Sequence, residues 1–380
     1  MKIVHVGLDL VPSSGGTVAS IRDFSQAVKS SIISFTGPEK LKTEASAIPD
    51  TVHVETSPGF LGRSFAWAPE VNRRQALDTI NDADLIVCHL LLRYHVHWVK
   101  AVAKRKNIPY WVVPHGGLDP YVFSSRSLVK KIWFNLFGRS FLKNAACVIF
   151  ATEKEKIQAA PYYKGNNCCV IHWPVQALDG ARSDFTRKLI CRKYGIASDE
   201  KILLYLGRLH QSKRPLETIT AFAQAKTSGV HLLVVGPEDT ISQNDCIGLA
   251  KALGADNIHV TGAVYGEEKN DYLLAADAYI SLSAKENFGY TTAEALSAGL
   301  PVILSPGNAL RYDISHLSCG WMLAEDTLAS AIGAIKEFAA TQKEKLAEMG
   351  QRGQQWALAE LAKEKYDNNI RLLAHKTVDK

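Results

Sequence analysis

Short apolar runs alternate with helix-length amphipathic segments along most of this chain. The runs are rich in Val, Ile and Leu, as in KILLYLG (201–207), and a segment such as RPLETITAFAQAK (214–226) follows most of them. Strands of this kind are buried on both faces, so the pattern predicts parallel sheets covered by helices, an α/β fold. The predicted strands are 2–7, 30–35, 53–57, 84–89, 110–115, 146–151 and 167–174, then 201–207, 230–236, 258–262, 278–283 and 301–305.

This alternation pauses once, in HWPVQALDGARSDFTRKLICRKYGI (172–196), and a new series begins at Lys201. A chain of 380 residues is also too long for one ordinary core. We therefore expect two doubly wound domains, 1–172 and 173–355, followed by one amphipathic helix at about 356–380. In such domains ligands bind at the carboxyl ends of the strands, here in a cleft between the halves.

The composition is that of a globular protein, with 47% hydrophobic and 22% charged residues. No apolar run approaches the roughly 20 residues that span a bilayer, and MKIVHVGLDL reads as a strand and not a leader, so we expect a cytoplasmic protein. The seven cysteines are odd in number and form no CxxC, which favours free thiols over disulfides or a zinc site. A net charge of +6 permits a nucleotide, a lipid phosphate or a membrane surface as partner, and we expect no nucleic acid.

Two carboxylates bracket an aromatic-glycine-aromatic turn in ENFGYTTAE, Glu286 to Glu294, and a helix is expected to begin near Gly289–Tyr290. Such a helix start presents backbone N–H groups and the positive end of the helix dipole, which bind phosphate. A carboxylate accepts from adjacent sugar hydroxyls, so each acid suits one sugar-like ring. The alternative is that Glu286 is a solvated loop acid and Glu294 only complements the helix dipole.

Arg208 and Lys213 lie in YLGRLHQSKRP (205–215), in the loop after the first strand of the second half. A guanidinium fork and a lysine point charge together neutralise a diphosphate well. A generic basic loop is the alternative.

Two segments of the first half also follow predicted strands. SSGGTVAS (13–20) contains Gly15 and Gly16, but lacks the GxGxxG pattern of a dinucleotide site. In VVPHGGLDP (112–120), His115 stands at a strand end, where a functional role competes with a structural one.

In this order, the segments resemble a retaining family-four glycosyltransferase of the two-Rossmann-domain (GT-B) architecture, and the resemblance covers nearly the whole chain. The most specific signature is the Glu-x7-Glu pair, and GRLHQSK (207–213) resembles the diphosphate-binding segment. GGTVASIRDFSQAV (15–28) resembles the amino-terminal glycine loop and its helix, and 257–307 reads like the carboxyl-terminal core throughout. One departure is HWPV (172–175), where the family has Asn-Gly at the end of its inter-domain strand.

The resemblance implies a role for each matching residue. Glu286 would bind the donor-sugar hydroxyls, Glu294 the ribose, and His115 would contact the sugar beside the reacting carbon. The final helix would cross back to the first domain. The implied catalytic residues are His115, Arg208, Lys213 and Glu286. The implied donor-binding residues are Gly15, Gly16, Arg208, Lys213, Gly236, Pro237, Val264, Glu286, Asn287, Phe288, Gly289, Tyr290 and Glu294.

The implied reaction moves a hexose, with UDP-glucose as the first choice of donor, to a sugar or a polyprenyl-diphosphate-linked oligosaccharide in polysaccharide or glycoconjugate synthesis. The resemblance implies retention through front-face attack. The cations and the helix start would stabilise the leaving diphosphate, so we expect no metal and no cofactor. Two alternatives stay open: a UDP-sugar epimerase of the same fold, and a non-catalytic nucleotide-binding regulatory subunit.

Two further segments are ambiguous. RSLVKKIWFNLFGRSFLKN (126–144) is basic and aromatic at helical spacing, which fits either a domain helix with a solvated basic face or a peripheral contact with the inner face of the cytoplasmic membrane. His95 and His97 alternate, but two histidines without further ligands at metal spacing are a weak metal signal. With Arg93 and Tyr94 they fit the acceptor side instead.

Overall fold

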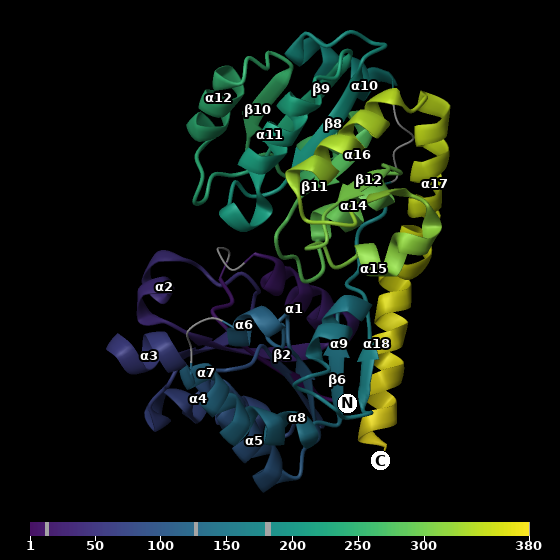
Figure 1. Cartoon of the computed structure of the whole chain (residues 1–380). Coiled ribbons are helices and arrows are strands. Elements are labelled where there is room, and N and C mark those ends of the chain that lie inside the picture. The colour runs from purple at the N-terminus through teal and green to yellow at the C-terminus, as the bar shows by residue number, and fades with distance from the viewer. Residues whose placement is uncertain (12–14, 125–127, 179–183, 380) are drawn as a thin grey trace. The chain divides into compact units, whose positions relative to one another are not determined.

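The structure is a computed structural model that describes residues 1–11, 15–124, 128–178 and 184–379. The chain forms two compact units, Met1–Pro174 with Lys363–Lys380, and Val175–Ala362 (Figure 1). We call them unit 1 and unit 2. Parts of the predicted segments 13–20, 126–144 and 172–196 fall outside the described residues, namely 13–14, 126–127 and 179–183.

Unit 1 contains a seven-stranded sheet in the order β3-β2-β1-β4-β5-β6-β7, and every neighbouring pair is parallel. All five residues of β4 are buried, as expected for a strand covered on both faces. The strands are β1 (Ile3–Leu8), β2 (Ser30–Thr36), β3 (Thr51–Glu55), β4 (Leu85–His89), β5 (Tyr110–Val113), β6 (Cys147–Phe150) and β7 (Cys168–Val170).

Helices cover this sheet, and the last helix of the chain packs on the first. The ring of Phe24 in α1 lies 6.2 Å from that of Tyr366 in α18, and Arg371 Nε donates to the carbonyl of Ala27 over 3.0 Å. The helices are α1 (Gly16–Ala27), α2 (Pro38–Thr43), α3 (Gly59–Phe65), α4 (Glu70–Ile80), α5 (Tyr94–Lys106), α6 (Pro120–Ser124), α7 (Leu128–Trp133), the π-helical turn η2 (Phe134–Gly138), α8 (Arg139–Lys143), α9 (Glu153–Ala159) and α18 (Lys363–Val378).

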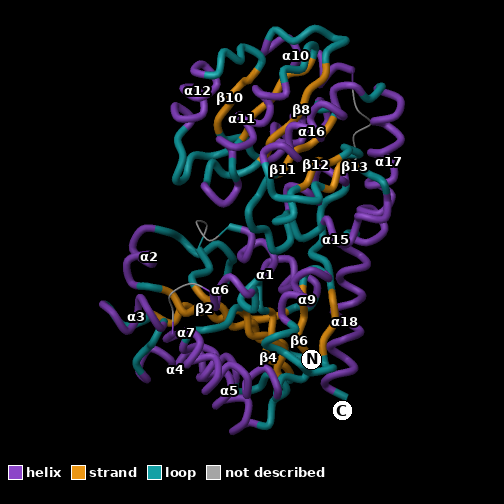
Figure 2. Tube along the Cα trace, viewed as in Figure 1, coloured by secondary structure: helices purple, strands orange, loops and turns teal. Residues whose placement is uncertain are grey.

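Unit 2 contains a six-stranded sheet in the order β10-β9-β8-β11-β12-β13, again wholly parallel. Figure 2 draws the strands of both units in orange. Its central strand β8 is buried along nearly its whole length, and Leu203 and Tyr205 lie in the main core of the unit. The strands are β8 (Lys201–Leu206), β9 (Val230–Val235), β10 (Ile258–Gly262), β11 (Ala278–Ser281), β12 (Val302–Leu304) and β13 (Gly320–Met322).

The helices of unit 2 start where the sequence supplies caps or turns. Ser242 and Asp245 form a reciprocal capping box at the start of α12, which satisfies two backbone N–H groups. Buried residues of α11, α12 and α16 share one apolar cluster with β8 and β9. The helices are α10 (Asp184–Tyr194), η3 (Gln211–Lys213), α11 (Pro215–Ala225), α12 (Gln243–Ala252), α13 (Gly266–Ala275), α14 (Tyr290–Ser297), α15 (Arg311–Ile314), η4 (Ser315–Leu317), α16 (Leu328–Ala340) and α17 (Lys343–Glu360).

The predicted fold class is confirmed, and each of the twelve predicted strands is present within a few residues. Sequence reasoning missed β13, because Gly320–Met322 is too short to show a pattern. The prediction of one helix over 356–380 is wrong. Two helices, α17 and α18, meet there with a break at Leu361–Ala362, where the carbonyl of Leu361 accepts from the backbone N–H of Val175 over 3.0 Å and not from the next turn of a helix.

Glycine allows α17 to approach the end of α14 closely. A Cβ atom at Gly350 would lie 1.9 Å from the carbonyl oxygen of Gly299, which follows α14 with a φ of +72°. A Cβ atom at Gly353 would lie 2.8 Å from Leu296 Cδ2. The close packing of α14 and α17 therefore depends on glycine, which has no side chain, at positions 350 and 353.

We predict that Gly350→Ala lowers the free energy of unfolding of unit 2 by about 1–3 kcal/mol, because the backbone must move apart to admit a methyl group. The matched control is Gly248→Ala on the exposed face of α12, where a Cβ atom meets nothing within 4 Å. This control should gain about 0.5–1 kcal/mol from reduced backbone entropy. Urea titration followed by circular dichroism measures both, and equal midpoints for the two variants would contradict the packing argument.

Candidate active site

The carboxyl ends of β8, β9 and β10 meet through backbone contacts between glycines. Gly207 donates to the carbonyl of Val235 over 2.9 Å, and Gly236 donates to that of Gly262 over 2.8 Å. A Cβ atom at Gly236 would lie 1.8 Å from the carbonyl oxygen of Gly207, so only glycine fits there. This edge of the sheet is lined by main chain, which is the kind of surface that a ligand can approach closely.

The loop after β8 carries two cations toward this edge. Arg208 is about half exposed, and its Nη1 atom lies 2.7 Å from Oδ2 of Asp239, in the loop after β9. Lys213 ends the short helix η3 and forms an ion pair with Glu286. His210 caps η3, because its Nδ1 atom accepts from the backbone N–H of Ser212 over 3.0 Å.

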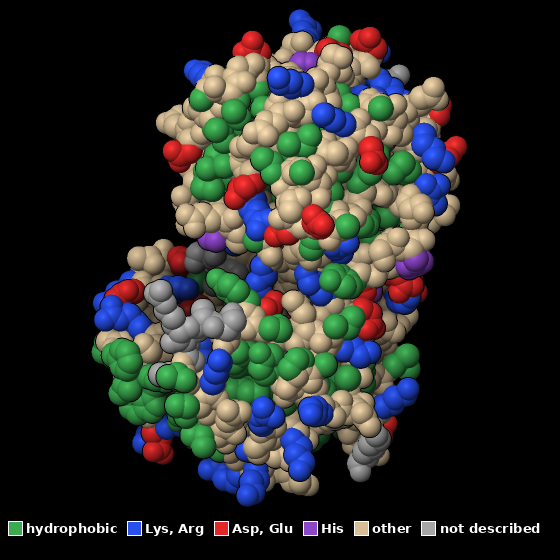
Figure 3. Space-filling view, in the orientation of Figure 1, with side chains coloured by type: hydrophobic (Ala, Val, Ile, Leu, Met, Phe, Trp, Pro, Cys, Tyr) green, Lys and Arg blue, Asp and Glu red, His purple; other side chains and the backbone are tan. Residues whose placement is uncertain are grey.

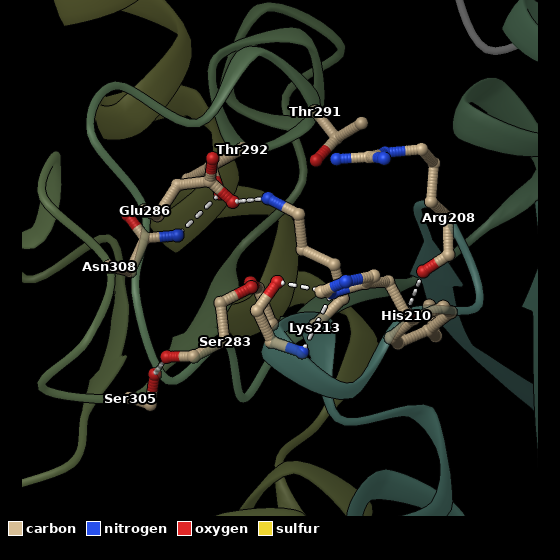
Figure 4. Close-up of polar contacts among 12 residues, drawn as sticks. Arg208, His210, Lys213, Ser283, Glu286, Thr291, Thr292, Ser305 and Asn308 are labelled. Atoms are coloured by element: carbon tan, nitrogen blue, oxygen red, sulfur yellow. Dashed lines mark hydrogen bonds and ion pairs between the residues drawn. The ribbon is translucent and has the colours of Figure 1, made fainter. Parts of the chain in front are cut away.

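The loop after β11 brings Glu286 to Lys213. Two backbone hydrogen bonds hold this loop: Ala284 donates to the carbonyl of Ser212 over 2.8 Å, and Glu286 donates to that of Gly307 over 3.0 Å. Gly289 then turns the chain with a φ of +87°, and α14 begins at Tyr290, as the sequence predicted. No side chain caps this start of the helix. In Figure 4 the side chain of Arg208 points toward Thr291, in the first turn of α14. The two predicted cations therefore converge on the positive end of this helix.

Asn308 supports the turn from behind. It is fully buried, and its Nδ2 atom donates to Oγ1 of Thr292 over 2.8 Å. A Cβ atom at Gly289 would lie 3.5 Å from that nitrogen and 3.0 Å from Cγ of Glu286. A side chain at residue 289 would therefore press on the side chain of Glu286.

Glu294 lies one turn inside α14 and is held by a lysine of its own. Its Oε1 atom is 2.7 Å from Nζ of Lys269 in α13, and both side chains are mostly buried. One carboxylate oxygen is therefore engaged by this ion pair, and the hydrogen-bonding capacity of the other carboxylate oxygen suits a hydroxyl group. The two acids of the Glu-x7-Glu pair are thus oriented by different lysines.

Three further residues implied to bind the donor, Gly236, Pro237 and Val264, lie near one another after β9 and β10. Gly236 and Pro237 follow β9, and Val264 stands two residues after Gly262, the partner of Gly236. Val264 is buried, and the carbonyl of Pro237 accepts from Leu209 over 2.8 Å. Asn287, Phe288, Gly289 and Tyr290 complete the loop described above, with the Phe288 and Tyr290 rings 5.1 Å apart.

The remaining predicted residues belong to unit 1. Gly15 has a φ of +61° and immediately precedes α1, which starts at Gly16. His115 follows β5 in a left-handed conformation with a φ of +49°. Its loop is held by buried Glu155, which accepts from the backbone N–H of Gly116 over 2.6 Å. The roles of Gly15, Gly16 and His115 stay predictions, as do those of the site residues in unit 2.

Sequence reasoning missed three residues that contact the predicted site of unit 2: Asp239, Lys269 and Asn308. Asp239 and Asn308 each stand shortly after a strand, β9 and β12, so their position at the carboxyl edge of the sheet was the available signal. Lys269 gave no signal of its own, because its partner Glu294 is 25 residues away.

Across the described residues, no group of three or more His, Cys, Asp or Glu side chains is placed to hold a metal ion. The sequence does contain an Asp-x-Asp, at Asp82 and Asp84. These acids stand at the amino end of β4, where Asp84 accepts from the backbone N–H of Lys2 over 2.6 Å and Asp82 pairs with Nζ of Lys2 at 3.9 Å. They lie at the end of the strand opposite to the one that carries the predicted site residues of unit 1.

Two family models match the two halves of the chain. Residues 15–177 match the model described as Glycosyltransferase Family 4, and residues 186–356 match the model described as Glycosyl transferases group 1. The chain belongs to glycosyltransferase family 4. It is therefore a glycosyltransferase with the GT-B fold, as the sequence signature predicted.

Curated relatives and solved structures agree with this family. The glycosyltransferase is 26% identical to the GDP-mannose:cellobiosyl-diphosphopolyprenol alpha-mannosyltransferase of Xanthomonas campestris, over 80% of this chain and 78% of that one. It is 28% identical to the alpha-monoglucosyldiacylglycerol synthase of Streptococcus pneumoniae, over 72% of this chain and 62% of that one. In fold it is similar to HepE of Anabaena in complex with UDP and glucose, with a TM-score of 0.76, 19% identity and coverage of 99% and 100% of the two chains.

We predict that Gly289→Ala weakens the binding of a nucleotide sugar by at least about tenfold, because a positive φ is strained in alanine and the new methyl group displaces Glu286, the acid expected to bind the sugar hydroxyls. The matched control is Gly254→Ala, which has a φ of +64° but meets nothing within 4 Å. It should lose stability from the same strain and keep its affinity. Calorimetric titration decides, and unchanged affinity in Gly289→Ala would contradict the packing described for this turn.

Proposed function

We propose that this glycosyltransferase moves a hexose from a nucleotide sugar to a lipid-linked or sugar acceptor, with retention of the anomeric configuration and without a metal. The observation that carries the proposal is the convergence of Arg208, Lys213 and the start of α14 in unit 2 (Figure 4). Two cations and the positive end of a helix dipole, at the carboxyl edge of one sheet, are the features that bind a diphosphate.

The chemistry follows from where charge develops. When the bond between the anomeric carbon and the phosphate oxygen breaks, negative charge grows on the leaving diphosphate, and preorganised cations lower the energy of that transition state. The bond to the acceptor oxygen forms on the same face, and the proton of the acceptor hydroxyl passes to the departing phosphate. In the structure, Asp239 and Glu286 neutralise Arg208 and Lys213, so a bound diphosphate takes over these cations.

The two acids bind opposite ends of the donor. Glu286, beside the cation pair, accepts from hydroxyls of the transferred sugar, and Glu294, beside Lys269, accepts from the ribose. We take UDP-glucose as the first donor to test. GDP-mannose is the second, because the mannosyltransferase of Xanthomonas campestris carries that donor in its name. A thermal-shift comparison of the two nucleotide sugars distinguishes them.

We predict that Arg208→Ala and Lys213→Ala each lower kcat by about 10²–10³-fold, because each removes one group that stabilises the leaving diphosphate. The control is Lys251→Ala on the exposed face of α12. Transfer is followed by NMR in buffer with a chelator, which also reports the anomeric configuration of the product. Near-normal rates in both variants would refute the diphosphate role, an inverted product would refute retention, and loss of activity with the chelator would refute metal independence.

Unit 1 offers a cationic region for the acceptor. Two neighbouring cavities, of about 220 and 560 Å³, lie at the carboxyl ends of β1 to β5 and share Arg63 and Arg93 in their walls. Phe60, Trp133 and Lys130 also line the larger one. Of the side chains that the sequence suggested for the acceptor side, Arg93 lines both cavities. His95 is buried, and His97 packs on Phe137 with ring centres 4.2 Å apart. Arginines beside aromatic rings suit a phosphate-linked lipid acceptor.

A hydrophobic surface borders the larger cavity. Its residues are Phe60 and Leu61 of α3 with Leu128, Ile132, Leu136 and Phe137 of α7 and η2, and all six are exposed. Figure 3 shows hydrophobic side chains gathered over α3 and the neighbouring α7. Phe134, Phe141 and Leu142 form the core-facing side of the same segment, as expected for a domain helix. We propose that its exposed side contacts a membrane surface. No helix in the described ranges is long and apolar enough to cross a bilayer.

We predict that the wild-type protein sediments with vesicles that contain anionic lipid and that Ile132→Glu with Leu136→Glu reduces the bound fraction several-fold, because charges replace the inserting side chains. The control is Leu189→Glu, which changes an equally exposed leucine on α10 of unit 2. Equal sedimentation of the two variants would exclude this surface as the membrane contact.

A further inference from the structure

Three histidines form a continuous hydrogen-bonded chain inside unit 1. They are His5 in β1, His89 at the end of β4 and His115 after β5. Nδ1 of His5 lies 2.8 Å from Nε2 of His89, and Nδ1 of His89 lies 3.0 Å from Nε2 of His115. The successive ring planes are tilted by only 19° and 28°, so the nitrogen lone pairs and N–H groups point along the chain.

Apolar side chains surround this row of three hydrogen-bonded histidines. The edge of Phe24 packs on His5, with ring centres 4.9 Å apart, and Trp173 packs on His115 at 5.7 Å. His5 and His89 are fully buried. Burial lowers the pKa of His5 and of His115 to about 3, and burial with the neighbouring histidines holds the pKa of His89 well below its usual value. All three rings are therefore neutral, with one proton each.

Because the three rings are neutral, all hydrogen bonds between them donate in the same direction. His89 has one proton and two nitrogen contacts, so it donates to one neighbour and accepts from the other. If the protons pointed toward His5, its outer Nε2 would carry an N–H group. That nitrogen is buried and has no hydrogen-bond partner. A buried N–H group without an acceptor is rarer and more costly than a bare acceptor, so the protons point the other way.

The carbonyl of His89 is fixed as well. It accepts a hydrogen bond from Nε2 of His95 over 2.9 Å. Since the backbone and the side chain of His89 are both held, its ring stays in place between His5 and His115.

We propose that His115 acts as a neutral hydrogen-bond donor through its Nδ1–H group, and that His5 and His89 are positioning residues that fix this tautomer. His5 Nδ1–H donates to His89, His89 Nδ1–H donates to Nε2 of His115, and the remaining N–H of His115 lies at the partly exposed end of the chain. Its ligand, resting on the proposed function, is an oxygen atom of the donor sugar or of the departing phosphate. With its proton on Nδ1 and Nε2 occupied, His115 does not serve as a general base.

The direction of the chain is tested on the free wild-type protein, with ¹⁵N-labelled histidine and NMR spectra that separate protonated from bare ring nitrogens. The His115→Gln spectrum assigns the signals. We expect a protonated Nδ1 and a bare Nε2 in His115. A bare Nδ1 with a protonated Nε2, or a charged ring, overturns the proposal. This result does not depend on the substrate, so it stands apart from any failure of the proposed function.

The positioning role is tested with two substitutions of His89. His89→Gln keeps an N–H group that can donate to His115, whereas His89→Leu keeps only the volume. We expect kcat to fall about 10–100-fold in His89→Leu, the size of loss seen when a group that orients a metal-binding histidine is removed, and to recover in part in His89→Gln. A merely structural role gives the opposite order, because leucine suits a buried apolar site better than glutamine. Equal or reversed kcat values in folded variants would refute the positioning role.

Discussion

Positive charge gathered at one edge of the second sheet is the constraint on which this structure depends. In a parallel sheet the helices that follow the strands all begin at the same edge, so their positive dipole ends lie close together. Arg208 and Lys213 add two formal charges there, and the chain balances them with Asp239 and Glu286. The close approach of Gly207 and Gly236 removes the side chains that would otherwise fill this edge. An anionic ligand is what such a surface stabilises.

Each acid of the Glu-x7-Glu pair has a lysine of its own. Lys213 holds Glu286 before the start of α14, and Lys269 on α13 holds Glu294 one turn inside that helix. A lysine that exchanges its carboxylate for a phosphate leaves that carboxylate ready to accept from a sugar hydroxyl. Under the proposed function, the site therefore changes ion-pair partners when the donor binds.

Residues that lie in strong local patterns were predictable from the sequence, and those that depend on distant partners were not. The buried strands and the start of α14 followed from apolar runs and from Gly289. His5 and His89 sit inside apolar strands, where an isolated histidine gives no sign of a partner 84 residues away. The break between α17 and α18 depends on contacts around Leu361, which an amphipathic pattern does not report. Close glycine packing at Gly350 is likewise a property of the assembled unit.

The most direct measurement of the central claim is a calorimetric comparison of nucleotides that differ by one phosphate, UDP against UMP and GDP against GMP. If the cation pair and the start of α14 bind the diphosphate, the diphosphate of at least one base should bind at least about tenfold more tightly than its monophosphate, and this preference should shrink as salt is added. Equal affinities for diphosphate and monophosphate, at low and high salt, would contradict the account.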